Sequence, residues 1–190
     1  MPESYIIIAL AGVTFLLVLG VNSVYNWLVE LARRCDQAAA DIDVQLRQRH
    51  DLIPNLVATV KGYAAHEQAT FEAVARARSA AMSAPAGAGQ TTAELALTSA
   101  LGRLFAVAER YPELKASGPF LQLQGEIGDV ENKIAAARRF RNNVVAEYNI
   151  TRTQFPNNLV AALCRFHARD PGIVPEETRG TIDTAPAVAF

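Results

Sequence analysis

The most informative feature of this sequence is a long stretch without charge. No Asp, Glu, Lys or Arg occurs from Ser4 to Val29, and most of the residues between them are apolar. A surface helix of a soluble protein would carry a polar face, so this stretch does not have the composition of one. At a rise of about 1.5 Å per residue, roughly twenty apolar residues cross a hydrocarbon core of about 30 Å. The sequence therefore predicts a membrane anchor within residues 1–29.

The residues at the edges of this stretch are typical of a membrane interface. Tyr5 lies near one end, and Tyr25 and Trp27 lie near the other, where aromatic belts are expected. A cleaved signal peptide is the competing interpretation, because the small residues around Ser23 would suit a signal peptidase. The segment before the apolar run has no Lys or Arg, however, and a secretory signal normally begins with positive charge. This favours a retained anchor.

The charges beside the anchor predict its orientation. Only Glu3 precedes it, whereas Arg33 and Arg34 follow it. Because positive residues remain on the cytoplasmic side, the N-terminus is expected outside and the rest of the chain in the cytoplasm. The two cysteines, Cys35 and Cys164, form no CxxC pair and are expected to be free thiols in a reducing compartment.

The sequence also lacks the basic excess of a nucleic-acid-binding protein. Eighteen Lys and Arg residues face nineteen Asp and Glu residues, for a formal net charge of −1. Phosphate binding normally requires a clear positive balance, so nucleic acid is excluded as a partner.

The chain also lacks runs of alternating β-branched residues, which are typical of strands. The composition after the anchor therefore predicts helices. We predict an all-α fold: a single transmembrane helix followed by an elongated antiparallel helical bundle with long, coiled-coil-like helices. The bundle spans residues 30–169 and contains a linker at residues 82–92, whose last threonines can cap the next helix. Residues 170–190 are expected to form a flexible tail.

The most regular helix is expected between Pro119 and Pro156. A three- and four-residue spacing from Phe120 to Phe155 meets apolar or aromatic residues almost throughout, with Arg141 and Thr151 as exceptions. Such a stripe requires a partner helix along its length. The segment after Pro156, residues 157–168, is expected to fold back as the last helix.

One passage, DLIPNLVATVKGYAAHE, combines residues that could perform chemistry. His50 lies just before it on an apolar stripe between Leu46 and Ile53, which is typical of a core histidine. Pro54 leaves the His50 carbonyl without its helical donor, so either the helix kinks or Asp51 caps a new segment. Both interpretations are architectural.

Catalytic and metal-binding motifs are incomplete. His66-Glu67 begins an HExxH pattern, but Thr70 stands where the second histidine would be. The chain contains no GxxxxGK[ST] phosphate loop and no GxSxG nucleophile turn. Glu126, Asp129 and Glu131 share a helix with several arginines, as on a solvated face. We therefore predict no catalytic, cofactor-binding or metal-binding residues, and no enzyme.

Several longer motifs resemble the LemA family of bacterial membrane-anchored helical proteins. They are YNWLVEL, IDVQLRQRHDLIPNLVATVKGYAAHE, AERYPELKA, ENKIAAARRFRNNVVAEYN and FPNNLVA, in this order between Tyr25 and Ala161. The chain departs from the family at Arg139-Phe140-Arg141-Asn142, where a Tyr-Asn pair is usual. The resemblance implies an N-terminal transmembrane helix with a cytoplasmic antiparallel helical bundle. It brings no established catalytic activity, and relatives in membrane-organelle systems such as the magnetosome favour scaffolding.

Two functions fit these observations. The first is a non-enzymatic scaffold or interaction protein that self-assembles at the inner face of the bacterial cytoplasmic membrane. The alternative is an accessory or regulatory subunit of a membrane enzyme, protease or transporter. The expected partners are the lipid bilayer, further copies of the chain and, under the alternative, a second membrane protein. The candidate partner surface consists of polar residues around the proline: Arg47, Arg49, Asp51, Asn55 and Lys61.

Overall fold

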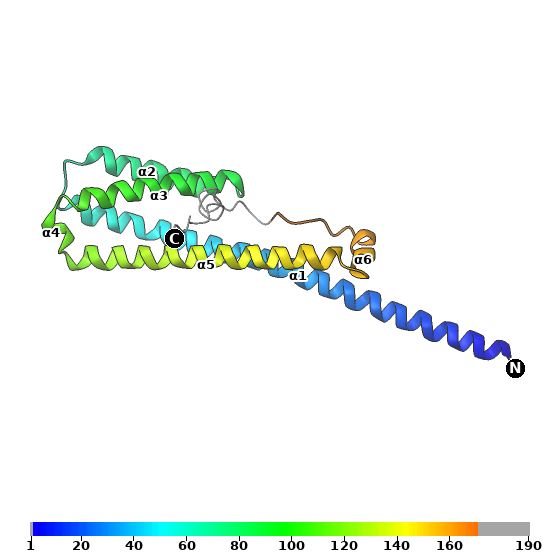
Figure 1. Ribbon diagram of the computed structural model, residues 1–190. Helices are drawn as coiled ribbons and strands as arrows, with labels where there is room; N and C mark the ends of the chain where they lie inside the picture. The colour runs from blue at the N-terminus through cyan, green and yellow to red at the C-terminus, as the bar shows by residue number, and fades with distance from the viewer. Residues whose placement is uncertain (1, 171–190) are drawn as a thin grey trace, which may run out of the picture. The chain divides into compact units, whose positions relative to one another are not determined.

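The computed structural model of the protein describes residues 2–170, and all regular elements among them are α-helices (Figure 1). The helices are α1 (Pro2–Lys61), α2 (Gln68–Ser83), α3 (Ala88–Ala108), α4 (Pro112–Lys115), α5 (Gly118–Thr153) and α6 (Asn157–Leu163). This confirms the all-α prediction. The predicted flexible tail lies, from residue 171 onward, outside the described residues.

The described chain divides into two compact units. Unit 1 comprises residues 2–44 and 134–170, and unit 2 comprises residues 45–133. Both α1 and α5 therefore contribute residues to each unit.

Helix α1 is a single helix of 60 residues that begins in the apolar stretch. It is long and apolar enough to cross a membrane, and the side chains of its most apolar segment, near the N-terminus, are not buried. The exposed fraction of Tyr5, for example, is 71%, and that of Leu16 is 67%. In water such a surface would be strongly unfavourable, whereas hydrocarbon solvates it. The structure thus confirms one long apolar N-terminal helix.

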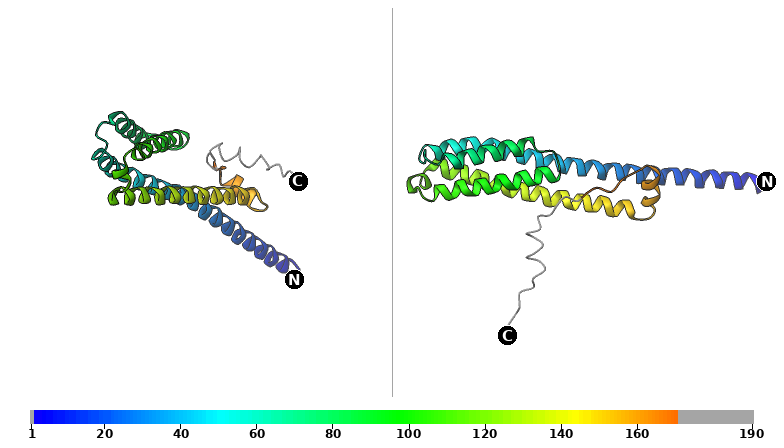
Figure 2. Two further views of the ribbon diagram at one scale, coloured as in Figure 1. Left: turned by 60° about the vertical axis from the view of Figure 1, so that its left-hand side comes forward. Right: turned by 90° about the horizontal axis from the view of Figure 1, so that it is seen from above.

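Unit 2 is a helical bundle with one apolar core. Helices α2 and α3 lie side by side and run in opposite directions, joined by a short loop (Figures 1 and 2). The core takes side chains from five helices and from the loop after α1. Its large members include Ile53, Leu56, Phe71, Leu97, Leu104, Leu114, Phe120 and Ile127. Burial of each such side chain stabilises the bundle by about 1.5–3 kcal/mol before entropy is counted.

The break between α2 and α3 is shorter than the predicted linker at residues 82–92, because only residues 84–87 are non-helical. Gly87 precedes α3 with a φ of 103°, a conformation that favours glycine. Thr91 and Thr92 do not cap the helix, which corrects the prediction. Their hydroxyls donate instead to the carbonyls four residues earlier, at 3.2 and 3.0 Å, because the helix has already begun.

In unit 1, α1 packs against the second half of α5. The core joins Leu31 and Cys35 of α1 with Val144, Val145 and Tyr148 of α5. The predicted stripe of α5 is confirmed at most positions, with Ile134 only 2% exposed and Tyr148 also 2% exposed. Phe155 contradicts the stripe, because it follows the end of α5 and is 80% exposed.

The chain after Pro156 folds back, but α6 ends at Leu163, five residues before the predicted end of the last helix. Arg165 has a φ of 57°, which a continuing α-helix does not allow. Side chains of α5 form hydrogen bonds with the backbone of the residues after Arg165. The Tyr148 hydroxyl donates to the His167 carbonyl at 2.9 Å, and Asn149 both donates to and accepts from the Arg169 backbone. The Arg169 guanidinium also pairs with Asp36.

Candidate functional site

A buried group of charged side chains in unit 2 is the most unusual feature of the described residues. Arg49 is 2% exposed and His50 is 6% exposed, although both are polar. They occupy the turn of α1 between the buried residues Leu46 and Ile53, so the helical periodicity directs them into the bundle. Arginine is rarely buried unless it is paired, and the partners of Arg49 therefore define the site.

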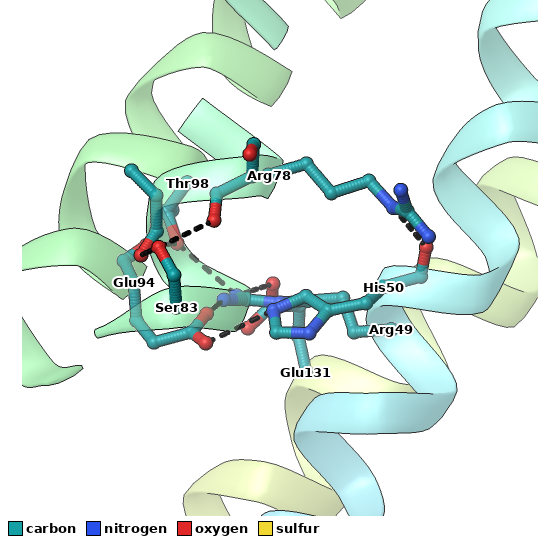
Figure 3. Close-up of polar contacts among 9 residues, drawn as sticks. Arg49, His50, Arg78, Ser83, Glu94, Thr98 and Glu131 are labelled. Carbon is teal, nitrogen blue, oxygen red and sulfur yellow. Dashed lines mark hydrogen bonds and ion pairs between the residues drawn. The ribbon is translucent and has the colours of Figure 1, made fainter. Parts of the chain in front are cut away.

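Three side chains from two other helices surround the Arg49 guanidinium (Figure 3). It pairs with Glu94 of α3, and its Nη1 donates to Glu131 Oε1 of α5 at 2.6 Å. The same nitrogen lies 3.2 Å from Thr98 Oγ1. Because the guanidinium presents several donors in a fixed plane, it can bind both carboxylates at once and so connects α1, α3 and α5.

Glu94 contacts His50 as well as Arg49. Its carboxylate is 2% exposed, and Oε1 lies 3.0 Å from His50 Nε2. Burial, followed by the charges of Arg49 and Arg78, holds the pKa of His50 below its usual value, although Asp51 opposes the shift. Because a carboxylate oxygen only accepts hydrogen bonds, the His50 Nε2–H donates to Glu94. Stability from this arrangement is fully present above the ordinary histidine pKa and decreases as the pH falls below it.

The backbone carbonyl of His50 has a partner of its own. It is the carbonyl to which an N–H at position 54 would donate in an uninterrupted helix, and Pro54 has none. Arg78 of α2 fills this role, since its Nε donates to the His50 carbonyl at 2.7 Å (Figure 3). α1 continues through Pro54 to Lys61, so of the two alternatives for Pro54 the one in which Asp51 caps a new segment is wrong. The proline thus provides an acceptor for a neighbouring helix.

We expect Arg78→Ala to lower the free energy of unfolding by about 1.5–3 kcal/mol, because it leaves the His50 carbonyl without a donor. In a Pro54→Ala background the restored N–H can bond to that carbonyl, and the cost of Arg78→Ala should fall by about 1–2 kcal/mol. Denaturant unfolding of the four proteins measures this coupling. Arg76→Ala, on the exposed side of α2, is the control and should change stability by less than about 0.5 kcal/mol. Equal costs of Arg78→Ala in both backgrounds would contradict the proposed role of Pro54.

The structure corrects two sequence-based interpretations. Arg49 does not belong to an exposed partner surface, because it is buried by Glu94 and Glu131. Glu131 is not on a freely solvated face, since its carboxylate binds Arg49. The other four residues of the candidate partner surface are exposed: Arg47, Asp51, Asn55 and Lys61.

Sequence reasoning missed three members of the cluster, namely Arg78, Glu94 and Glu131. One signal could have revealed Glu94. It occupies the apolar face of α3 together with Leu97, Leu101 and Leu104, all of which are buried. A carboxylate at such a position requires a cation opposite it, and the similarly placed Arg49 is the candidate.

The cluster has the chemistry of a structural ion pair. One carboxylate oxygen of Glu94 binds the imidazole Nε2 of His50, and Arg49 binds the other oxygen of Glu94 and the carboxylate of Glu131. Arg49 Nε is buried and has no partner in the part of the chain that the structure describes, so the network there is not fully satisfied. Within residues 2–170, no three His, Cys, Asp or Glu side chains gather in the manner of a metal site. The Thr98 hydroxyl donates to the Glu94 backbone carbonyl at 3.0 Å, whereas covalent catalysis would require it to donate to a base.

The predicted interface residues lie on α1. Tyr5 and Trp27 are exposed, at 71% and 44%. Tyr25 packs edge to face against Phe166, with ring centroids 5.8 Å apart. Arg33 is exposed, and Arg34 forms an exposed ion pair with Glu30 at 2.6 Å.

Comparison with known proteins points to one family. The LemA family model matches residues 38–190. Among curated proteins, the chain is 25% identical to magnetosome protein MamQ of Magnetospirillum gryphiswaldense, over 75% of this chain and 62% of the relative. It is 24% identical to magnetosome proteins MamQ 1 and MamQ 2 of Paramagnetospirillum magneticum, with the same coverage. The matched region therefore spans less than two thirds of these relatives.

Proposed function

The chain belongs to the LemA family, and from this premise we propose that it is a membrane-anchored, non-enzymatic scaffold or interaction protein. Its anchor lies in the bacterial cytoplasmic membrane with the N-terminus outside. Its helical units lie on the cytoplasmic side, where copies of the chain assemble with one another.

A single observation carries this proposal: one helix, α1, contains both the membrane segment and the two cluster residues Arg49 and His50. The residues of α1 from Ser4 to Ser23 are all exposed, and the same helix continues to Arg49 and Lys61. No break separates a removable leader from the folded part of the chain. This supports a retained anchor that is integral to the fold, and Arg33 and Arg34 at its end support a cytoplasmic position for the remainder of the chain.

The proposed non-enzymatic role follows from the chemistry of the cluster. Its carboxylates neutralise Arg49, and the low pKa of His50 results from burial among cations. Perturbed groups of this kind mark catalytic sites only when they face a reacting group, and structural ion-pair networks perturb pKa values as well. We therefore assign the cluster the task of fixing how α1, α2, α3 and α5 pack within unit 2.

The relatives support a role at a membrane structure, since they are named magnetosome proteins. Self-assembly is supported by large apolar side chains left exposed outside the anchor. Leu121 is 51% exposed and Leu95 is 50% exposed, both in unit 2. We propose the exposed polar residues Arg47, Asp51, Asn55 and Lys61 as part of the contact.

Mass photometry of the detergent-purified full-length protein tests this function. We expect a homo-oligomer of defined mass, because the scaffold hypothesis requires contacts between copies. Arg47→Glu should shift the distribution toward the monomer, whereas Arg103→Glu, an exposed change on α3, should leave it unaltered. A monomer that co-purifies with one membrane enzyme or transporter would contradict self-assembly and favour the accessory-subunit alternative.

A further inference from the structure

An exposed apolar surface lies at the end of α5 and on α6, outside the proposed anchor. Phe155 and Leu163 are each 80% exposed, and Leu159 is 61% exposed. Residues 153–164 contain no charge, while Arg152 and Arg165 stand on either side. Large apolar side chains grouped in this way usually mark a contact with another apolar phase.

The packing of unit 1 places this surface near the end of the anchor. Cys35 of α1 lies against Val144 of α5, with its Sγ 3.7 Å from the Val144 carbonyl, and Leu31 shares a core with Tyr148. The two helices therefore run antiparallel, and a step toward the N-terminus on α1 matches a step toward the C-terminus on α5. Both helices rise by about 1.5 Å per residue, so Phe155 falls approximately level with Tyr25.

A direct contact with Tyr25 indicates that the residues just after α6 lie at the same height along α1 as Tyr25. The ring of Phe166, just after α6, packs edge to face on Tyr25 at 5.8 Å. Figure 2 shows α6, in orange, at the end of α5. Tyr25 and Trp27 are the aromatic residues at the cytoplasmic edge of the proposed anchor, where an aromatic belt meets the headgroups.

Helix α6 has two different faces. Val160 and Ala161 are buried, at 6% and 3% exposed, and so face the protein. Leu159 and Leu163 are exposed and one turn apart, so they share the opposite face. Arg165 follows this face and is exposed, where its guanidinium can pair with a phosphate group.

We propose that the α5–α6 turn and α6 form a second membrane contact, in which Phe155, Leu159 and Leu163 enter the headgroup and acyl-chain boundary of the bilayer. The partner of this surface is the lipid bilayer, because the surface lies at the height of Tyr25, where α1 leaves the membrane. The inference rests on the proposed membrane anchor. An anchor and a lateral contact together would fix the tilt and rotation of unit 1 relative to the bilayer, which one helix alone leaves free.

Depth-dependent fluorescence quenching in proteoliposomes tests the contact. The full-length protein carries Cys164→Ser and a single bimane-labelled cysteine at position 163, 16 or 136. Cys35 stays in place, because it is 2% exposed and burial raises the pKa of its thiol, so it should not react. The lipids carry a nitroxide either near the headgroup or near the end of the acyl chain.

We expect the Leu163→Cys label to be quenched about twofold more strongly by the shallow nitroxide than by the deep one, as interfacial helices lie about 5–10 Å deep. The Leu16→Cys label, within the anchor, should be quenched by the deep nitroxide. The Ala136→Cys label is the matched control on α5. It is exposed, lies about 28 Å along the helix from Phe155, and should not be quenched by either lipid.

The outcomes separate the contact from the anchor. If Leu16→Cys is quenched and Leu163→Cys behaves like Ala136→Cys, the second contact is wrong and the anchor stands. If Leu16→Cys escapes quenching, the anchor itself is wrong and the contact that rests on it falls too. Circular dichroism of each labelled protein verifies that the helices are intact.

Discussion

Replacing Arg49 with methionine is expected to destabilise unit 2 by about 3–5 kcal/mol, because removing one partner of a buried ion pair leaves the other charge unpaired. Glu94 is 2% exposed and, among residues 2–170, would keep only the His50 imidazole as a side-chain partner. A typical domain is stable by about 5–15 kcal/mol, so the loss is a large fraction of the total. Urea unfolding in mild detergent, followed by circular dichroism, measures it.

Two comparisons make this prediction specific. Arg47→Met changes an exposed arginine on the same helix and should alter stability by less than about 0.5 kcal/mol. The double replacement Arg49→Met with Glu94→Leu removes both buried charges and should recover most of the loss. If Arg49→Met were as mild as Arg47→Met, Arg49 would be solvated and the cluster would not hold the bundle together.

Ile134→Asp is expected to cost several kcal/mol by a different mechanism. Ile134 is 2% exposed on the packed face of α5, and the substitution both removes an apolar side chain and buries a carboxylate without a cation. Because stability is about 5–15 kcal/mol in total, we expect much of the protein to unfold at room temperature. The thermal unfolding midpoint reports the effect.

The matched control is Ala136→Asp, which introduces the same side chain two residues away on the exposed face of α5. It should cost less than about 1 kcal/mol, the difference in helix propensity between the two residues. Equal unfolding midpoints for Ile134→Asp and Ala136→Asp would contradict the assignment of the buried face.

The helical periodicity of the sequence predicted this face because burial follows a three- and four-residue spacing along α5. It identified Ile134 and Tyr148 as buried, and the structure agrees. It failed at Phe155, because periodicity does not show where the helix ends or whether a protein partner continues beyond it. The exposed Phe155 became informative only once its level relative to Tyr25 was known from the packing of unit 1.

The charged cluster was harder to predict for a physical reason. An arginine is usually solvated, and what reverses this for Arg49 is Glu94, which lies 45 positions later on another helix. Similarly, the sequence showed that Pro54 frees the His50 carbonyl, since that follows from local helix geometry. It did not show that Arg78 donates to this carbonyl, because that contact depends on how α2 packs against α1.

Cysteine accessibility in spheroplasts tests the central claim, a retained anchor with the helical units in the cytoplasm. Two full-length proteins, each with Cys164→Ser, carry one new cysteine: Ser4→Cys before the apolar run or Leu95→Cys on exposed α3. With a membrane-impermeant maleimide, we predict labelling at position 4 in intact spheroplasts and labelling at position 95 only after lysis. A cleaved leader would remove the cysteine at position 4 from the mature protein. Labelling at position 95 before lysis would contradict the account.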